Sequence, residues 1–335
     1  MKRIPKIALA CMMSAVIAVP ALAHHSAAAF DSQKTVQVKG TVKVYSFKNP
    51  HVYMTVQVRN ADGSPGSLME VEAGAASVLN GLGFTKESVK VGEEVTITGN
   101  PGRNAPDKLM LGRDLVKADG TYIPLNISSR SVYTSKDAVA TSIEGTWFSP
   151  RTEFTRFLGG ARGWAVTDKG RTAMGVVDPK ATTQKDCVPI GAPALMFYPV
   201  ATTIKAEKDR VVLDVDWMDS ERVVYLDGRK APAQATMLGH SVGRWEGKTL
   251  VVETTNFKEH ANGLSTSLPS STQKKLIERF ALSPDGKSLT YSGTVEDPVY
   301  LTKPIEWTGK WEYRPGMPHS NQKCDLEVAR KFLTD

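Results

Sequence analysis

The stretch VQVKGTVKV, residues 36–44, decides the class of fold, because every second position from Val36 to Val44 is valine or glycine. Alternation with a period of two is typical of a β-strand, whose successive side chains point to opposite faces. The same pattern returns at residues 52–58, after a break at Asn49-Pro50. Residues 60–63, with the sequence NADG, then predict a turn.

The rest of the first third of the chain continues this β-rich pattern. Further strands are predicted at Leu68–Ala73, Glu94–Thr98 and Lys108–Val116, and the Ala-rich piece Gly74–Leu82 predicts a short helix. Three strands, one short helix and two strands form the element order of an OB-type barrel of five strands. We therefore expect an OB-like β-domain over residues 24–127.

A second β-rich region is predicted over residues 143–335, after a Ser-rich linker at 128–142 that has no apolar period. Many short strands separated by turn signals, without a long amphipathic helix, favour an antiparallel barrel or sandwich. Its opening, Gly145-Thr146-Trp147, is similar to the start of lipocalin-like barrels. The predicted strands are Arg210–Trp217, Arg222–Leu226, Thr249–Phe257, Lys274–Leu282, Ser288–Val295 and Glu306–Tyr313.

The first 23 residues have the pattern of a secretory signal peptide. A positive start is followed by an apolar run from Ile7 to Val19 and by the small-residue cleavage signal Ala21-Leu22-Ala23. Cys11 lies in a poor lipoprotein signal, which leaves cleavage before His24 as the favoured reading. No later segment approaches the ~20 apolar residues of a membrane-spanning helix. The sequence thus predicts an exported protein without a membrane span, working in a bacterial periplasm.

Charge and cysteine content narrow the function classes. Without residues 1–23, the formal net charge falls from +7 to +4, with 39 basic and 35 acidic residues. The basic residues are scattered singly, which argues against a nucleic-acid partner. Cys11 leaves with the leader, and the remaining pair, Cys187 and Cys324, predicts one disulfide in an oxidising compartment.

Three histidines suggest a metal site. Cleavage after Ala23 gives His24 a free amine beside its own imidazole, and His25 follows directly. Such nitrogen ligands suit copper(II) in tetragonal geometry, and His51, at the head of the next strand, is the candidate for a third ring. The alternative is that His24 and His25 belong to a frayed terminus, while His51 packs or caps a turn.

Charged residues share strand faces with apolar neighbours in the second domain. Arg222 alternates with Val224, Glu278 alternates with Phe280, and Glu253 alternates with Val251 and Phe257. If these faces point inward, each charge needs a partner or a ligand, because an unpaired buried charge is costly. His240, beside a predicted turn, joins them as a candidate ligand-binding residue at the barrel mouth. The alternative is an internal Arg–Glu pair that only closes the barrel.

Residues 239–243, with the sequence GHSVG, match the pattern of hydrolase nucleophile elbows. That elbow requires a strand, a sharp turn and then a helix, whereas here a strand follows at Leu250-Val251-Val252. The sequence therefore predicts a hairpin, and the match is interpreted as coincidental. No Gly-rich phosphate loop, dinucleotide fingerprint or CxxC motif occurs, which argues against nucleotide, flavin and thioredoxin-like functions.

Two sets of motifs resemble known families. The run His24-His25-Ser26 together with Asn49-Pro50-His51 resembles the bacterial domain of unknown function 6152, over about residues 24–117. The remainder resembles uncharacterised exported bacterial proteins through the motif GHSVGRWEG at residues 239–247. These resemblances imply an exported protein with two domains and imply no particular activity.

The sequence thus favours an exported binding protein, with a histidine site for copper or a similar metal and a small-molecule cavity in the second domain. The alternative is an enzyme, a hydrolase, lyase or isomerase, with Glu278 or Glu253 as acid/base and Arg222 or His240 stabilising negative charge. A third interpretation is an accessory protein that docks on another exported protein. The surroundings of Glu278 distinguish the first two: an open pocket favours catalysis, and a clamp to Arg222 opposes it.

Overall fold

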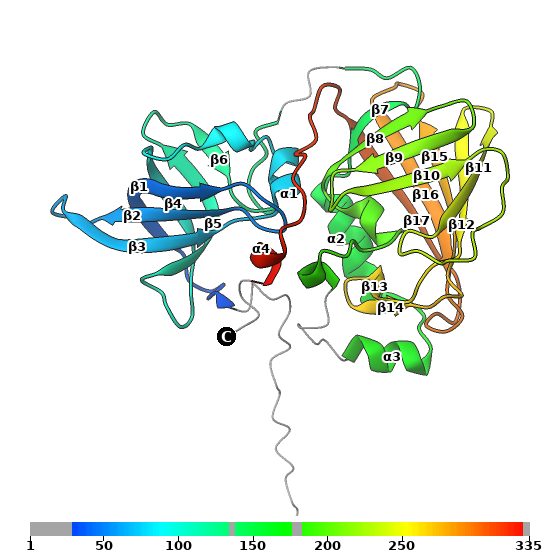
Figure 1. Ribbon diagram of the computed structural model, residues 1–335, viewed down its shortest axis with the longest axis horizontal. Helices are drawn as coiled ribbons and strands as arrows, with labels where there is room; N and C mark the ends of the chain where they lie inside the picture. Colours follow the sequence, from blue (N-terminus) through cyan, green and yellow to red (C-terminus); the bar gives the residue numbers. More distant parts are fainter. Residues whose placement is uncertain (1–28, 134–137, 176–182, 331–335) are drawn as a thin grey trace, which may run out of the picture.

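Two β-barrels lie side by side in the computed structural model, which describes residues 29–133, 138–175 and 183–330 (Figure 1). The expected leader, His24 and His25 lie outside the described residues, as do residues 134–137 of the expected linker. The prediction of a mainly β protein with an OB-like barrel followed by a larger one is confirmed. No helix of the described ranges has the length and apolar character needed to cross a membrane.

The first barrel has the predicted OB-like element order. Its sheet runs β3-β2-β1-β4-β5-β6, and a parallel pairing of β3 with β5 closes the ring of five strands. The short strand β6 was not predicted, because its three residues are too few to show a period. The elements are β1 Val36–Ser46, β2 Tyr53–Arg59, β3 Pro65–Glu72, α1 Ala76–Gly81, η2 Lys86–Ser88, β4 Glu94–Pro101, β5 Leu109–Lys117 and β6 Tyr122–Pro124.

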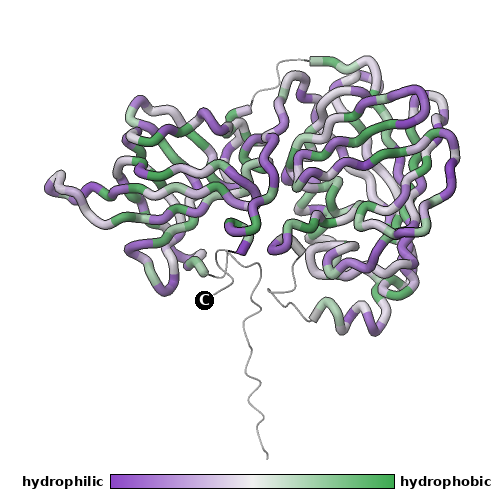
Figure 2. Tube along the Cα trace, viewed as in Figure 1, coloured by the Kyte–Doolittle hydropathy of each residue, from purple (hydrophilic) through white to green (hydrophobic). Residues whose placement is uncertain are grey.

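Alternation along the strands builds the core of this barrel. Val42, Val56 and Ile97 point inward and are fully buried, and Figure 2 shows hydrophobic and hydrophilic residues alternating along the strands of both barrels. Gly40 is required where β1 crosses β2, since a Cβ there would lie 2.2 Å from the carbonyl oxygen of Gln57. The barrel is thus held by burial of one face of each strand.

The second barrel is closed by nine strands in the order β10-β11-β12-β15-β16-β17-β7-β8-β9. Six of them coincide with the predicted strands to within three residues, whereas β8, β11 and the separate pair β13–β14 lacked a clear alternation. The strands are β7 Gly145–Phe148, β8 Ala201–Ala206, β9 Arg210–Val215, β10 Ser220–Tyr225, β11 His240–Glu246, β12 Thr249–Thr255, β13 His260–Ser265, β14 Leu268–Ser270, β15 Lys275–Leu282, β16 Ser288–Glu296 and β17 Ile305–Tyr313.

One seam of this barrel differs from the antiparallel expectation. β10 and β11 are parallel and share only the pairs Val224 with Ser241 and Tyr225 with Val242. Parallel neighbours need a long crossover, and the segment 226–239 provides it. Since β10 pairs with β9 along its whole length, residues 220–223 have a strand neighbour on one side only among the described residues.

A helical segment between β7 and β8 enters the second barrel, and the sequence did not predict it. Phe157 of α2 stacks on Phe197 of η6 at 4.1 Å between ring centroids, and Phe197 contacts Tyr291 of β16 at 5.3 Å. These rings fill the interior as a packed aromatic core. The helices are α2 Arg151–Gly160, η3 Ala161–Gly163, α3 Asp168–Gly175, η5 Thr183–Asp186 and η6 Ala194–Phe197.

The last described residues, 314–330, form a strap that runs between the barrels and ends in α4 Leu326–Arg330 (Figure 1). Arg314 of the strap donates a hydrogen bond of 2.5 Å to the carbonyl oxygen of Gly81 in the first barrel. Ser320 donates from its amide and its hydroxyl to Asp216, next to β9 of the second barrel. The strap therefore contacts both barrels.

Candidate functional site

A pocket with a volume of about 480 Å³ lies at the seam between β10 and β11. It opens where the two strands stop pairing, and the segment 226–239 forms its outer wall. We call it the seam pocket; the lining residues that matter for its chemistry are Pro189, Glu221, Arg222, Tyr225, Met237, His240 and Ser241. Two of the predicted ligand-binding residues, Arg222 and His240, thus lie at one site.

Arg222 lies on the inner wall of the seam pocket, with 1% of its side chain exposed. Its two terminal nitrogens bind Glu278 of β15 at 2.9 and 2.5 Å, and one of them also donates to Thr254 at 3.3 Å. Its Nε makes no hydrogen bond within the described part of the chain. Burial lowers the pKa of Arg222, but the Glu278 carboxylate outweighs this and raises the pKa above its usual value.

Glu278 is fully buried and also accepts a hydrogen bond of 2.8 Å from the hydroxyl of Tyr291. Burial and the neighbouring carboxylate raise the pKa of Tyr291 far above its ordinary value, so its hydroxyl keeps its proton as the donor. Glu278 is therefore clamped to Arg222 in a closed core rather than free in an open pocket. This is the arrangement expected for the internal Arg–Glu pair.

Glu253 lies on the outer face of the barrel, with 55% of its side chain exposed and 3.3 Å from Arg244. The alternation that grouped Glu253 with Phe257 stops at Thr255, because Asn256 has a φ of 59° and turns the chain. Glu253 therefore does not join Arg222 and Glu278.

Ser241 and His240 occupy the start of β11. Ser241 is buried, and its hydroxyl lies 2.9 Å from the hydroxyl of Thr254 on β12. β11 and β12 form an antiparallel hairpin, so the prediction of a hairpin at GHSVG is confirmed. The His240 ring stacks on Tyr225 at 5.4 Å, and its Nε2 lies 3.0 Å from the carbonyl oxygen of Arg229. His240 thus holds the segment 226–239 against the seam pocket.

Two buried basic side chains hold the segment 189–192 beside the pocket. Lys274 donates to the carbonyl oxygens of Ala192 and Gly263 at 2.9 and 3.1 Å, and burial lowers its pKa to about 7. His260 donates through Nε2 to Pro189 at 3.2 Å, and burial lowers its pKa to about 4. Sequence reasoning gave neither residue a role, because a lysine at a strand start and a histidine near a turn resemble surface residues.

His51 lies in the first barrel, away from the seam pocket. Its Nδ1 is 3.2 Å from the carbonyl oxygen of Ala73 and 3.2 Å from a carboxylate oxygen of Glu72, and 32% of its side chain is exposed. Within the ranges that the structure describes, no group of three or more His, Cys, Asp or Glu residues is arranged to hold a metal ion. The other predicted ligands, His24 and His25, are not among the described residues.

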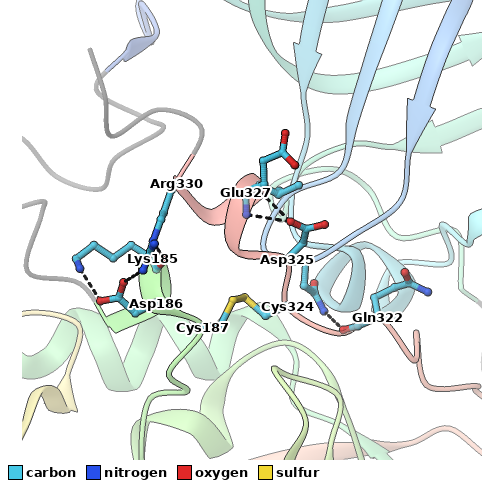
Figure 3. Close-up of a disulfide and its surroundings, with 10 residues drawn as sticks. Lys185, Asp186, Cys187, Gln322, Cys324, Asp325, Glu327 and Arg330 are labelled. Atoms are coloured by element: carbon cyan, nitrogen blue, oxygen red, sulfur yellow. Dashed lines mark hydrogen bonds and ion pairs between the residues drawn. A yellow bond between two sulfur atoms is a disulfide. The ribbon is translucent and has the colours of Figure 1, made fainter.

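Cys187 and Cys324 form the predicted disulfide bond, with 5.6 Å between their Cα atoms (Figure 3). The bond joins the segment that leads to Pro189 with the strap. It therefore lies close to both the seam pocket and the first barrel.

Fold and site together define a two-barrel β-protein with a buried ion pair behind a small pocket. Residues 12–109 match the model of a family described as "Family of unknown function (DUF6152)", which confirms the resemblance of the N-terminal region. This match covers less than a third of the chain. No curated protein matches the sequence, and the relationship suggested by GHSVGRWEG stays a prediction.

Proposed function

We propose that this chain is an exported binding protein whose second barrel takes a small molecule in the seam pocket. The observation that carries the proposal is a cavity of about 480 Å³ where the β10–β11 pairing ends, with Arg222 on its inner wall. Cavities of roughly 300–1,000 Å³ suit small ligands. The Nε of Arg222 makes no hydrogen bond to the described residues but is shielded from solvent, so a ligand acceptor would satisfy it once the pocket lining shifts to admit the ligand.

The lining favours a partly apolar ligand with one acceptor group. Pro189, Met237 and Leu238 supply apolar surface, and Tyr225 supplies a ring. The positive charge of Arg222 is balanced by Glu278, so a strongly charged anion gains little from it. A ring or short chain carrying a carbonyl or hydroxyl group fits this chemistry.

The surroundings of the candidate acid, base and nucleophile support binding over catalysis. Glu278 accepts hydrogen bonds from Arg222 and Tyr291, and the hydroxyl of Ser241 is hydrogen-bonded to the hydroxyl of Thr254. Glu253 lies outside the barrel. An acid/base must reach the proton that it transfers, and neither Glu278 nor Glu253 lines the seam pocket, whereas Glu221, the carboxylate that does line it, is exposed to solvent. We therefore prefer the binding protein to the hydrolase, lyase or isomerase.

A substitution that fills the seam pocket tests the proposed binding of a small molecule. Native mass spectrometry of protein purified from the cells that make it should show a retained small molecule, and Met237→Trp should lose it. Val116→Trp is the matched control, since Val116 is an exposed apolar residue of the first barrel. If wild type and both variants carry the same species, or none, the seam pocket is not a ligand site.

A second candidate function, binding of copper(II) by His24, His25 and His51, is supported by the surroundings of His51. Metal-ligating histidines commonly donate one ring nitrogen to a carboxylate or carbonyl, which orients the other toward the metal. Glu72 and Ala73 hold Nδ1 of His51 in this way. Titration of the leader-free protein should give tight binding that His51→Ala weakens and His319→Gln does not. Binding no tighter than micromolar in wild type would remove this function.

Export to the periplasm is part of the same proposal, because both the disulfide and the free amine of His24 depend on it. Cell fractionation followed by N-terminal sequencing should find the protein outside the cytoplasm with His24 as its first residue. A protein that still begins at Met1 would contradict export and, with it, the proposed copper site.

A further inference from the structure

The strap connects two candidate sites that lie in different barrels. On the first barrel it is seated on the turn that contains Asn49, which is 1% exposed. Asn49 donates from its side chain to the carbonyl oxygen of Gln322 at 2.8 Å, and it accepts from the amide of Asp325 at 2.9 Å. Cys324, between these two residues, forms a parallel bridge with Asn49. Cys324 is thereby fixed beside Asn49, which precedes His51 by two residues in the sequence.

On the second barrel, Cys187 begins the segment that borders the seam pocket. Pro189 lines the pocket and is held by His260, while Ala192 is held by Lys274. The bond between Cys187 and Cys324 therefore joins the Asn49 turn directly to the pocket wall. Figure 3 shows the bond between the two segments, with Asp325 and Gln322 on one side and Asp186 on the other.

Apart from the disulfide bond, only weak noncovalent contacts among the described residues hold α4, the end of the strap, near the second barrel. No residue of α4 is buried, and a groove of about 670 Å³ separates it from β1 and β2. Near the bond, Arg330 pairs with Asp186 at 2.7 Å through side chains that are 55% and 39% exposed. Exposed ion pairs stabilise little, because water screens them. The covalent bond is thus the main local attachment of α4 to the second barrel.

We propose that the Cys187–Cys324 bond is a redox-sensitive latch that fixes the seam-pocket wall to the first barrel. A dithiol reductant opens it: the bond between the two sulfurs breaks, each sulfur receives one electron and one proton, and the sulfurs of the dithiol join in a disulfide. Both cysteines are only partly buried, so a dithiol can reach them. Opening frees α4 from the second barrel and leaves the segment 187–192 held by noncovalent contacts such as the hydrogen bonds of Lys274 and His260, so this segment moves more freely.

Hydrogen exchange followed by mass spectrometry tests the latch. Wild type is compared in its oxidised form, after treatment with dithiothreitol, and as the double variant Cys187→Ser/Cys324→Ser. At the shortest labelling times, exchange at 187–192 and 322–330 should rise about tenfold or more in the two open forms, while the barrel strands stay protected. Unchanged exchange in both segments would refute the latch. So would equal loss of protection in the barrel strands, since the bond would then hold the whole fold.

A variant that keeps the bond separates the latch from the strap's other contacts. Lys48 is half exposed and binds Asp325 at 2.7 Å, so Lys48→Ala weakens the seat of the strap without touching the cysteines. Exchange should then rise at 324–330 alone, with 187–192 still protected. If Lys48→Ala loosens 187–192 as much as the double serine variant does, the bond is not the latch. Because no ligand is used, the result is independent of the proposed binding function.

Discussion

Arg222 and Glu278 face each other inside the second barrel, and at most 1% of either side chain is exposed. Each charge depends on the other, since burial separates both from the bulk water that would solvate a lone ion. Tyr291 and Thr254 complete the cluster with hydrogen bonds of 2.8 and 3.3 Å. The pair therefore fixes how β10 and β15 face each other, and it also places Arg222 behind the seam pocket.

Removing one partner should cost more than removing both. Glu278→Ala leaves the guanidinium of Arg222 buried without a counter-charge, so we expect it to lower the free energy of unfolding by about 3–5 kcal/mol. The double variant Arg222→Met/Glu278→Leu should lie closer to wild type, because it buries no charge. Urea denaturation is measured for wild type, for Glu278→Ala, for the double variant and for its two singles, Arg222→Met and Glu278→Leu. A double variant as unstable as the sum of its singles would show that the charges do not depend on each other.

His260 should make stability depend on pH. Burial lowers its pKa from 6.5 to about 4, so the unfolded chain takes up the proton first as the pH falls. The contribution of neutral His260 to the free energy of unfolding is fully present above pH 6.5. It is lost as the pH falls toward 4, by about 3 kcal/mol in total. Burial raises the pKa of Asp216 to about 6, which acts in the opposite direction over an overlapping range.

A comparison with His260→Gln isolates the histidine from Asp216. Glutamine can still donate to Pro189 but does not titrate. From pH 7 to pH 4.5, wild type should therefore lose about 2–3 kcal/mol more than the variant in urea denaturation. Parallel pH profiles for the two proteins would mean that His260 takes up its proton equally in the folded and unfolded states.

At the scale of elements, strands with a clear alternation could be predicted and those without it could not. β1 buries every second residue from Val38 to Val42, before a β-bulge turns Val44 outward, whereas β11 contains Gly243, Arg244 and Trp245 without a period. Such a strand becomes recognisable only when its neighbours are known. α2 was missed for a similar reason, since Phe157 and Leu158 alone are buried in it.

The residues of the candidate site also divide into those that the sequence could predict and those that it could not. Arg222 and Glu278 could be predicted, because each is a charge on an otherwise apolar strand face. The sequence left their pairing as one of two alternatives, since the choice depends on barrel closure between residues 56 positions apart. Lys274 gave no signal at all, because its burial comes from the segment 189–192 and the β13–β14 pair folding over it.

The crossover 226–239 offers a matched pair of glycines that tests the seam. Gly239 has a φ of +74°, and a Cβ there would lie 2.7 Å from Thr254 and 2.8 Å from Phe257. Gly228 has a φ of +66°, with nothing near its Cβ position. Gly228→Ala should cost about 1 kcal/mol for the backbone alone, and Gly239→Ala about 2–4 kcal/mol because of the added contacts. Equal losses in urea denaturation would mean that β11 can shift away from the seam freely.

At the scale of the molecule, Arg314 joins the two barrels at the start of the strap. Its guanidinium donates to Gly81 of α1 and lies 3.7 Å from the ring centroid of Phe148 in β7. A side chain at Gly81 would collide with Phe148, since its Cβ would lie 2.3 Å from the ring. Glycine at this position thus allows the barrels to approach, and Arg314 covers the contact.

Arg314→Lys should therefore loosen the arrangement of the barrels while leaving each barrel folded. Lysine keeps the charge but lacks the planar group that stacks on Phe148 while donating to Gly81. We expect a larger radius of gyration in small-angle scattering, with unchanged far-ultraviolet circular dichroism. Arg130→Lys is the control, because Arg130 stacks on Tyr122 within the first barrel, at 4.5 Å. If the scattering of Arg314→Lys matches that of the control and of wild type, the disulfide and the remaining strap contacts suffice to hold the barrels together.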